Sequence, residues 1–162
     1  MSDCILILTT GGTIDKEYFD ALSRYQITDT MVNRLLAIAR VTHPFEVQEV
    51  SRKDSLDLTD DDRACLVTRV SAAASHRVII THGTDTMALT AEALAGVADK
   101  TIVLVGALAP ARFSETDAPF NLGMAFATAQ IAAPGIYITM NGSVFPGSGA
   151  VKDRKHGFVR KP

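Results

Sequence analysis

Residues 4–14 of the chain, CILILTTGGTI, join an unbroken apolar run to a turn rich in threonine and glycine. The run at 4–8 is partly β-branched and has no polar face, which is typical of a strand buried on both sides in a parallel sheet. Residues 9–13 would then lie at the carboxyl end of that strand, where open α/β sheets bind ligands. The stretch therefore predicts an α/β domain with polar groups at one edge of its sheet.

The rest of the chain alternates between strand and helix patterns. We expect four further strands, at residues 45–50, 78–80, 101–105 and 136–140. We expect four helices, from Thr28 or Asp29 to about 41, from a capping box at Thr59 through 60–74, and at 86–94 and 118–132. Residues 10–27 have no clean period and are expected to form a long loop, and 141–162 a loop-like end that could hold a hairpin. The prediction is one domain over 1–162, a doubly wound, mostly parallel sheet with helices on both faces.

Composition limits the classes of function. The 162 residues are 47% hydrophobic and 21% charged with a net charge of −2, which suits an ordinary globular domain. The charges interleave, so no basic patch predicts nucleic-acid binding, and no apolar run approaches the roughly 18 residues of a membrane span. The N-terminal apolar run is short and has no basic flank, so we expect a cytoplasmic protein. Cys4 and Cys65 lack the spacing of metal ligands and are expected to be small buried side chains.

A second loop resembles the first in chemistry. Residues 81–86, THGTDT, follow the predicted strand at 78–80 and lead directly into a predicted helix. Glycine permits a close approach of the backbone to a ligand, and a helix N-terminus offers free N–H groups to an anion. The patterns of dinucleotide-binding loops, P-loops and serine-hydrolase elbows are all missing from both loops. The four histidines show no metal spacing, so we expect no metal and no cofactor.

From the residues alone, the roles within this polar site stay open. Threonine is a weak nucleophile that needs a base or a charged neighbour, and Tyr18 and Asp85 are candidates because they lie close to Thr13 and Thr84 in the sequence. A lysine could shuttle the proton, but spacing does not select one. Asp85 could equally be a helix N-cap, and Ser55 a polar turn residue.

The two loops together resemble the paired signatures of the bacterial-type L-asparaginase family. TTGGTI after an N-terminal strand and THGTDTM between a strand and a helix occur in the family's order and at its approximate separation. Further similar segments are KDSLDLT at 53–59, VGAL at 105–108, DAPFNL at 117–122, and MNG at 140–142 followed by VK at 151–152. The resemblance covers essentially the whole chain.

The resemblance implies hydrolysis of the L-asparagine side-chain amide to L-aspartate and ammonia through a β-aspartyl-threonine intermediate. Thr13 would be the primary nucleophile, supported by Tyr18 from a mobile loop, with Tyr25 as the rival for that role. Thr84, Asp85 and Lys152 would form a second triad in which Asp85 orients Lys152 and Lys152 activates Thr84. The substrate would be held by Gly12, Asp54, Ser55, Gly83, Thr84 and Asp85.

Two departures from the family pattern carry further expectations. Family members usually continue into a second α/β domain, whereas this sequence ends shortly after Lys152, so we expect a short form that completes its site as a homodimer or higher homo-oligomer. Leu56 stands where many relatives have glutamine, which removes a polar contact and predicts modest affinity for asparagine, with glutamine weaker still. The alternatives are a non-catalytic amino-acid sensor and a glutaminase or amidotransferase-type subunit.

Overall fold

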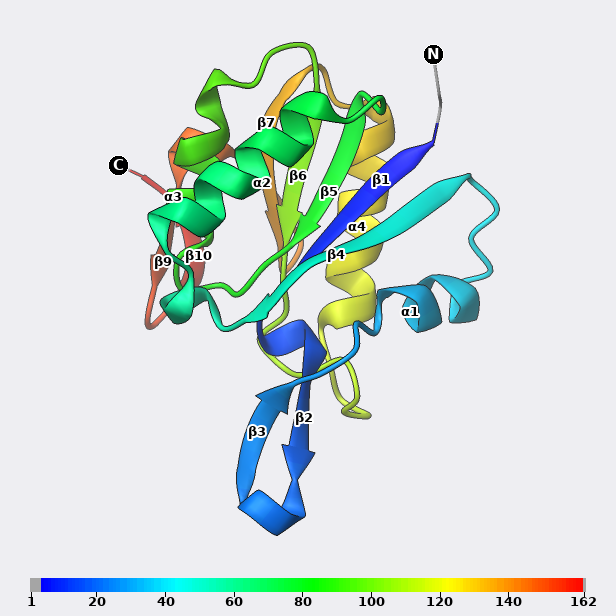
Figure 1. The fold of residues 1–162 in the computed structure, drawn as a ribbon, viewed down its shortest axis with the longest axis vertical. Coiled ribbons are helices and arrows are strands. Elements are labelled where there is room, and N and C mark those ends of the chain that lie inside the picture. Colours follow the sequence, from blue (N-terminus) through cyan, green and yellow to red (C-terminus); the bar gives the residue numbers. More distant parts are fainter. Residues whose placement is uncertain (1–3, 162) are drawn as a thin grey trace.

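Five parallel strands form the centre of the fold in a computed structural model that describes residues 4–161 (Figure 1). The sheet order is β4-β1-β5-β6-β7-β8, with only β8 antiparallel to its neighbour. Its strands are β1 (Ile5–Gly11), β4 (Phe45–Lys53), β5 (Arg77–Thr81), β6 (Thr101–Val105), β7 (Gly135–Met140) and β8 (Ser143–Pro146). The expected α/β architecture and all five predicted strands are therefore confirmed.

Helices cover both faces of this sheet. The first face packs against α1 (Val32–Ile38) and α4 (Ala118–Ile131), and the second against α2 (Asp60–Ala72) and α3 (Met87–Ala93). The capping box predicted at Thr59 is present, because its hydroxyl accepts from the Asp62 N–H while the Asp62 carboxylate accepts from the Thr59 N–H. The domain is thus doubly wound as predicted. None of the helices within residues 4–161 is long and apolar enough to cross a membrane.

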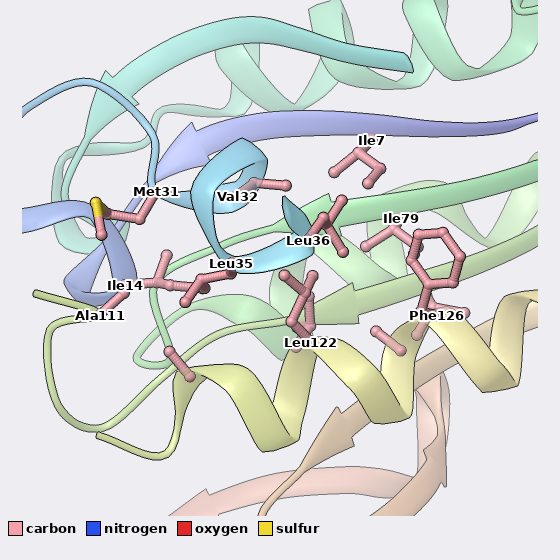
Figure 2. Close-up of a cluster of buried hydrophobic side chains, with 14 of the residues drawn as sticks. Ile7, Ile14, Met31, Val32, Leu35, Leu36, Ile79, Ala111, Leu122 and Phe126 are labelled. Atoms are coloured by element: carbon pink, nitrogen blue, oxygen red, sulfur yellow. The ribbon is translucent and has the colours of Figure 1, made fainter. Parts of the chain in front are cut away.

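Strand alternation divides the core into two layers. Figure 2 shows the first layer, in which Ile7 and Ile79 of the sheet pack with Leu36 of α1 and with Leu122 and Phe126 of α4. Neighbouring strand residues point the opposite way, so the second layer packs under α2 and α3. Its largest fully buried side chains include Leu8, Ile80, Met87, Leu94 and Leu104. Burial on both sides explains why these strands are continuous apolar runs.

The direction of the crossovers reverses between β1 and β5, and the space beyond the carboxyl ends of these two strands is called the crevice. The chain leaves β1 toward α1 on one face, but leaves the neighbouring β5 toward α3 on the other. Loops that diverge from adjacent strands leave a space at their carboxyl ends, and ligands of open α/β sheets bind there. Both loops singled out from the sequence lie at this point.

The expected long loop at 10–27 is wrong. It holds two short strands, β2 (Lys16–Phe19) and β3 (Arg24–Ile27), which pair antiparallel into a hairpin. Figure 1 shows this hairpin extending beyond the carboxyl ends of the central strands. Tyr18 faces Tyr25 across it with ring centroids 5.2 Å apart, and such aromatic cross-strand pairs stabilise hairpins. The two strands, KEYF and RYQI, are too short to show a period of two in the sequence.

The predicted bounds of the first helix, from residue 28 or 29 to about 41, are also wrong. The helix begins at Val32, because Asp15 accepts hydrogen bonds from the Thr30 hydroxyl and the Met31 N–H and so ties the preceding residues to the hairpin base. The helix ends at Ile38, which is 69% exposed. Near the other end of the chain, β9 (Ala150–Asp153) and β10 (Gly157–Arg160) form the hairpin that the sequence allowed. Cys65 is exposed and Cys4 half-buried, so the expectation of two buried cysteines is wrong.

A matched pair of substitutions in α4 tests the core. Leu122 is 1% exposed and Ile131 is 85% exposed on the same helix. Leu122→Ala should lower the free energy of unfolding by about 2–5 kcal/mol, because it removes buried methyl groups and leaves a cavity. Ile131→Ala should leave that energy within about 0.5 kcal/mol of the wild type. Urea denaturation measures both, and equal losses in the two variants would contradict the assignment of the core.

Candidate active site

At Gly12 and Gly83, the backbones of the loops that follow β1 and β5 are in direct contact, with no side chain between them. A Cβ placed on Gly12 would lie 2.4 Å from the Gly83 nitrogen, and one on Gly83 would lie 2.7 Å from Cβ and Oγ of Ser55. Gly12 also has φ +83°, a left-handed conformation that side chains disfavour. The loops after β1, β4 and β5 are therefore stacked directly on one another, and only glycine fits at the two inner positions.

A lysine joins the β5 loop from far along the chain. Lys152 Nζ in β9 lies 2.7 Å from Thr84 Oγ1 and 2.5 Å from Asp85 Oδ1. Thr84 is buried, whereas the lysine and the aspartate are partly open to solvent. Asp85 does not cap α3, whose N-cap is Thr86, so the helix-cap reading of Asp85 is wrong. The three side chains form a connected group in which a proton can pass between lysine and threonine while the carboxylate holds the lysine in place.

Thr13 lies on the other side of the glycine contact, at the start of a short 3-10 turn from Thr13 to Asp15. Its side chain is half-buried, and within residues 4–161 its hydroxyl has no hydrogen-bond partner. Tyr18 and Tyr25 are both about half exposed, and neither phenol is hydrogen-bonded to Thr13 or to any other described residue. The structure thus brings the two tyrosines to each other, and leaves the Thr13 hydroxyl available.

Ser55 supplies a buried hydroxyl beside Gly83. It is 1% exposed, and its Oγ has no hydrogen-bond partner among the described residues. Its carbonyl accepts from the Thr86 hydroxyl at 2.7 Å, which fixes the turn against the start of α3. A buried hydroxyl without a partner is costly, so this one is suited to binding an incoming polar group.

Asp54, which directly precedes Ser55, caps the short turn that contains it. One carboxylate oxygen accepts from the Leu56 N–H and the other lies 2.6 Å from Lys16 Nζ in the hairpin. Burial alone would raise the pKa of Asp54, but the hydrogen bonds from Lys16 and Leu56 outweigh it and leave that pKa below its ordinary value. Leu56 is 72% exposed and points away from this contact. The sequence resemblance placed Asp54 near the substrate, and the structure adds its partner Lys16, which spacing did not suggest.

His82 is a residue of the site region that sequence reasoning assigned no role. It is fully buried, with Nδ1 2.6 Å from the Gly83 carbonyl and Nε2 2.7 Å from Thr90 Oγ1. Burial lowers the pKa of His82 to about 4, so the ring is neutral at physiological pH. A carbonyl can only accept, so Nδ1 carries the proton and Nε2 accepts from Thr90. The neutral ring therefore holds the Gly83 carbonyl in place.

Asp15 fixes the other loop. Its buried carboxylate accepts from the Met31 N–H at 2.8 Å and from the Thr30 hydroxyl at 3.2 Å. Burial outweighs these hydrogen bonds and raises the pKa of Asp15 to about 6. Within the described residues, no group of three or more His, Cys, Asp or Glu side chains is placed to hold a metal ion.

Comparisons with known proteins show which sequences and folds this chain is similar to. A family model described as "Asparaginase, N-terminal" matches residues 4–158. L-asparaginase 2 of Escherichia coli is 33% identical over 91% of the chain, and the glutaminase-asparaginase of Acinetobacter glutaminasificans is 31% identical over 96%. The solved thermostable L-asparaginase from Thermococcus kodakarensis superimposes with a TM-score of 0.83 at 26% identity over 97% of the chain. The chain spans 46% of the E. coli protein, 52% of the Acinetobacter protein and 51% of the Thermococcus chain.

The raised pKa of Asp15 predicts a pH-dependent stability difference. A group that binds its proton more tightly when folded contributes stability below its unfolded pKa, near 3.8, and loses it as the pH rises through about 6. Asp15→Asn keeps an acceptor for the Met31 N–H but does not titrate. Its free energy of unfolding relative to the wild type should therefore rise between pH 4 and pH 7, by up to about 3 kcal/mol.

Urea denaturation of both proteins at the two pH values measures this difference. His82 has the opposite linkage, losing stability as the pH falls from 6.5 toward about 4, but it is present in both proteins and cancels. A difference that stays constant between pH 4 and pH 7 would show that Asp15 does not keep its proton in the folded state.

Proposed function

The chain belongs to the asparaginase family, and we propose that it hydrolyses the side-chain amide of L-asparagine to L-aspartate and ammonia. The observation that carries this proposal is the placement of Lys152 between Thr84 and Asp85, across the glycine contact from the unpartnered Thr13 hydroxyl. Two threonines at the meeting point of two strand-end loops provide one nucleophile and one partner for a proton-shuttling lysine. No cofactor takes part in the proposed reaction.

In the first half-reaction, Thr13 attacks the amide carbon. A bond forms between the threonine oxygen and that carbon, and the carbonyl electrons move to an oxyanion, for which backbone N–H groups near Gly12, Gly83 and Thr84 are suited donors. The tetrahedral adduct collapses as the carbon–nitrogen bond breaks, and the nitrogen takes up the proton that the threonine gives up. Ammonia leaves, and the product is a β-aspartyl ester of Thr13. Tyr18 is the proposed support for the nucleophile once the hairpin lies over the site.

In the second half-reaction, water cleaves the ester. Lys152 in its neutral form takes a proton from the Thr84 hydroxyl, to which it is hydrogen-bonded at 2.7 Å, while Asp85 keeps the ammonium form in place. Thr84 in turn withdraws a proton from the water that attacks the ester carbon. The carbon–oxygen bond to Thr13 breaks, the leaving Thr13 oxygen takes up the proton that Lys152 holds, and aspartate leaves.

Recognition of the amino-acid substrate uses the stacked loops. The buried hydroxyl of Ser55 and the Gly12–Gly83 backbone suit the α-carboxylate, and Asp85 suits the α-amino group. Asp54 supports this set by holding the Ser55 turn. L-Glutamine is proposed as a weaker substrate, because one extra methylene in a fitted site discriminates by roughly 10–200-fold.

Assembly and location complete the proposal. Tyr18, Tyr25 and Phe113 form an exposed aromatic group at the hairpin, with Tyr25 and Phe113 6.2 Å apart, and such a group is suited to contact with a second copy of the chain. We therefore keep a homodimer or higher homo-oligomer as the proposed state and the cytoplasm as the proposed location.

Sedimentation tests the assembly. At micromolar concentration the protein should sediment as a dimer or larger species, because the aromatic group would be buried between copies. Substituting Phe113 by serine should shift the population toward monomer. A fully active monomer in the wild type would overturn the proposed assembly.

Ammonia release from asparagine tests the chemistry. Thr13→Ala removes the proposed nucleophile and Lys152→Met removes the proton carrier, so each should lower kcat by at least about 100-fold, the lower end of the contribution of general acid–base groups. Lys155→Met is the matched control, because Lys155 is an exposed lysine in the same hairpin and contacts neither Thr84 nor Asp85. It should retain wild-type kcat.

The results separate the proposed enzyme from its alternatives. A protein that binds asparagine in calorimetry without releasing ammonia would be an amino-acid sensor. A kcat/KM for glutamine above that for asparagine would make it a glutaminase. Wild-type rates in both Thr13→Ala and Lys152→Met would sink the mechanism.

A further inference from the structure

Lys16 connects the hairpin to the substrate-binding turn. It is the first residue of β2, and its ammonium lies 2.6 Å from Asp54 at the other side of the crevice. Both side chains are about one-quarter to one-third exposed, so the pair is partly shielded from solvent. Tyr18 follows two residues later on the same strand, and side chains two apart point to the same side. The cation that touches Asp54 is therefore on the tyrosine-bearing side of the hairpin.

The carboxylate of Asp54 performs two separate tasks. Oδ1 accepts from the Leu56 N–H and so caps the short turn Ser55–Asp57, while Oδ2 pairs with Lys16. This turn places the buried hydroxyl of Ser55 against Gly83. A single carboxyl group thus links the strand that carries Tyr18 to the hydroxyl proposed to bind the substrate carboxylate.

The hairpin base is held independently of this ion pair. Asp15 accepts from Thr30 and Met31, and the Ala111 N–H donates to the Ile14 carbonyl. Glu17, the next residue of β2, pairs with Arg112 of the loop after β6 at 3.4 Å. Of the ion pairs among the described residues, the Lys16–Asp54 pair joins the hairpin to the Ser55 turn, whereas the Glu17–Arg112 pair joins it elsewhere.

We propose that Lys16 is a positioning residue, whose ion pair with Asp54 sets the hairpin and its Tyr18 relative to Ser55. The inference rests on the proposed function for its catalytic consequence, but the contact itself is independent of activity. Loss of either charge leaves both the fold and the core untouched, since the pair lies at the surface of the crevice. It frees the hairpin from the Ser55 turn and lets it open locally more often.

Proteolysis of the hairpin tests the contact without reference to catalysis. Arg24 is exposed in β3, so cleavage of the Arg24–Tyr25 bond by an arginine-specific protease, followed by mass spectrometry, reports hairpin opening. The variants are Lys16→Met, Asp54→Asn and the double variant, and Asp54→Asn retains the oxygen that caps the turn. Glu17→Gln is the matched control on the same strand. Tm values measured alongside identify any variant that is globally unfolded.

The expected result is non-additive. Each single variant should be cleaved about two- to fivefold faster than the wild type, as expected for a partly exposed ion pair, and the double variant no faster than the faster single one. If the singles are cleaved at the wild-type rate, or if their effects multiply in the double variant, the pair does not position the hairpin.

Kinetics distinguish positioning from a merely structural role. In the same variants kcat/KM for asparagine should fall by a similar factor, again without multiplying in the double variant, whereas Glu17→Gln should stay within about twofold of the wild type. An equal fall in Glu17→Gln would mean that any loosening of the hairpin has this effect, and would overturn the special role of Lys16. Should the wild type release no ammonia, the proposed function fails, while the proteolysis result still decides whether the ion pair holds the hairpin.

Discussion

The backbone contact between Gly12 and Gly83 is the constraint on which the site depends. Parallel strands β1 and β5 run in register, with Thr9 opposite Thr81, so their two loops emerge at the same level. The chain then turns toward opposite faces of the sheet, and the first residues of each loop are pressed together before they diverge. Because a Cβ on Gly12 would lie 2.4 Å from backbone nitrogen, no side chain can separate the loops. The positions of Thr13 and Thr84, each directly after one of these glycines, follow from that contact.

Two further layers of support surround the contact. On one side, the neutral ring of His82 hydrogen-bonds to the Gly83 carbonyl and is itself held by the Thr90 hydroxyl. In front, β9 delivers a lysine to the threonine and the aspartate of the same loop. The proposed reactive groups are therefore held by elements from the beginning, middle and end of the chain, whereas the hairpin with its tyrosines extends outward and its Lys16 pairs with Asp54 beside Ser55.

The sequence predicts those features that a local pattern dictates. The apolar run at 101–105 predicts β6 to the residue, because a strand buried on both faces is a continuous apolar run. The cap at Thr59 is predictable because its partner is three residues away. The sequence does not reveal the hairpin at 16–27, because its two four-residue strands, KEYF and RYQI, are too short to show a period of two. Sequence spacing alone does not identify Lys152, since it lies 68 residues from Thr84 and comes close to it only in the folded chain. The family resemblance supplied it, while Lys16, His82 and Asp15 gave no signal that spacing could detect.

The crowding around Ser55 has a consequence for redesign of the protein's selectivity. Gly12 is packed against the Gly83 backbone, and Gly83 against the backbone and side chain of Ser55. Most substitutions at these three positions would therefore disrupt the packing. Leu56, one residue along the same turn, is largely exposed and contributes only its N–H to the turn. Its side chain can be varied without disturbing that packing, which makes it the adjustable position beside an otherwise tightly packed turn. Diversity in substrate choice among natural or laboratory descendants of this chain should therefore accumulate there first.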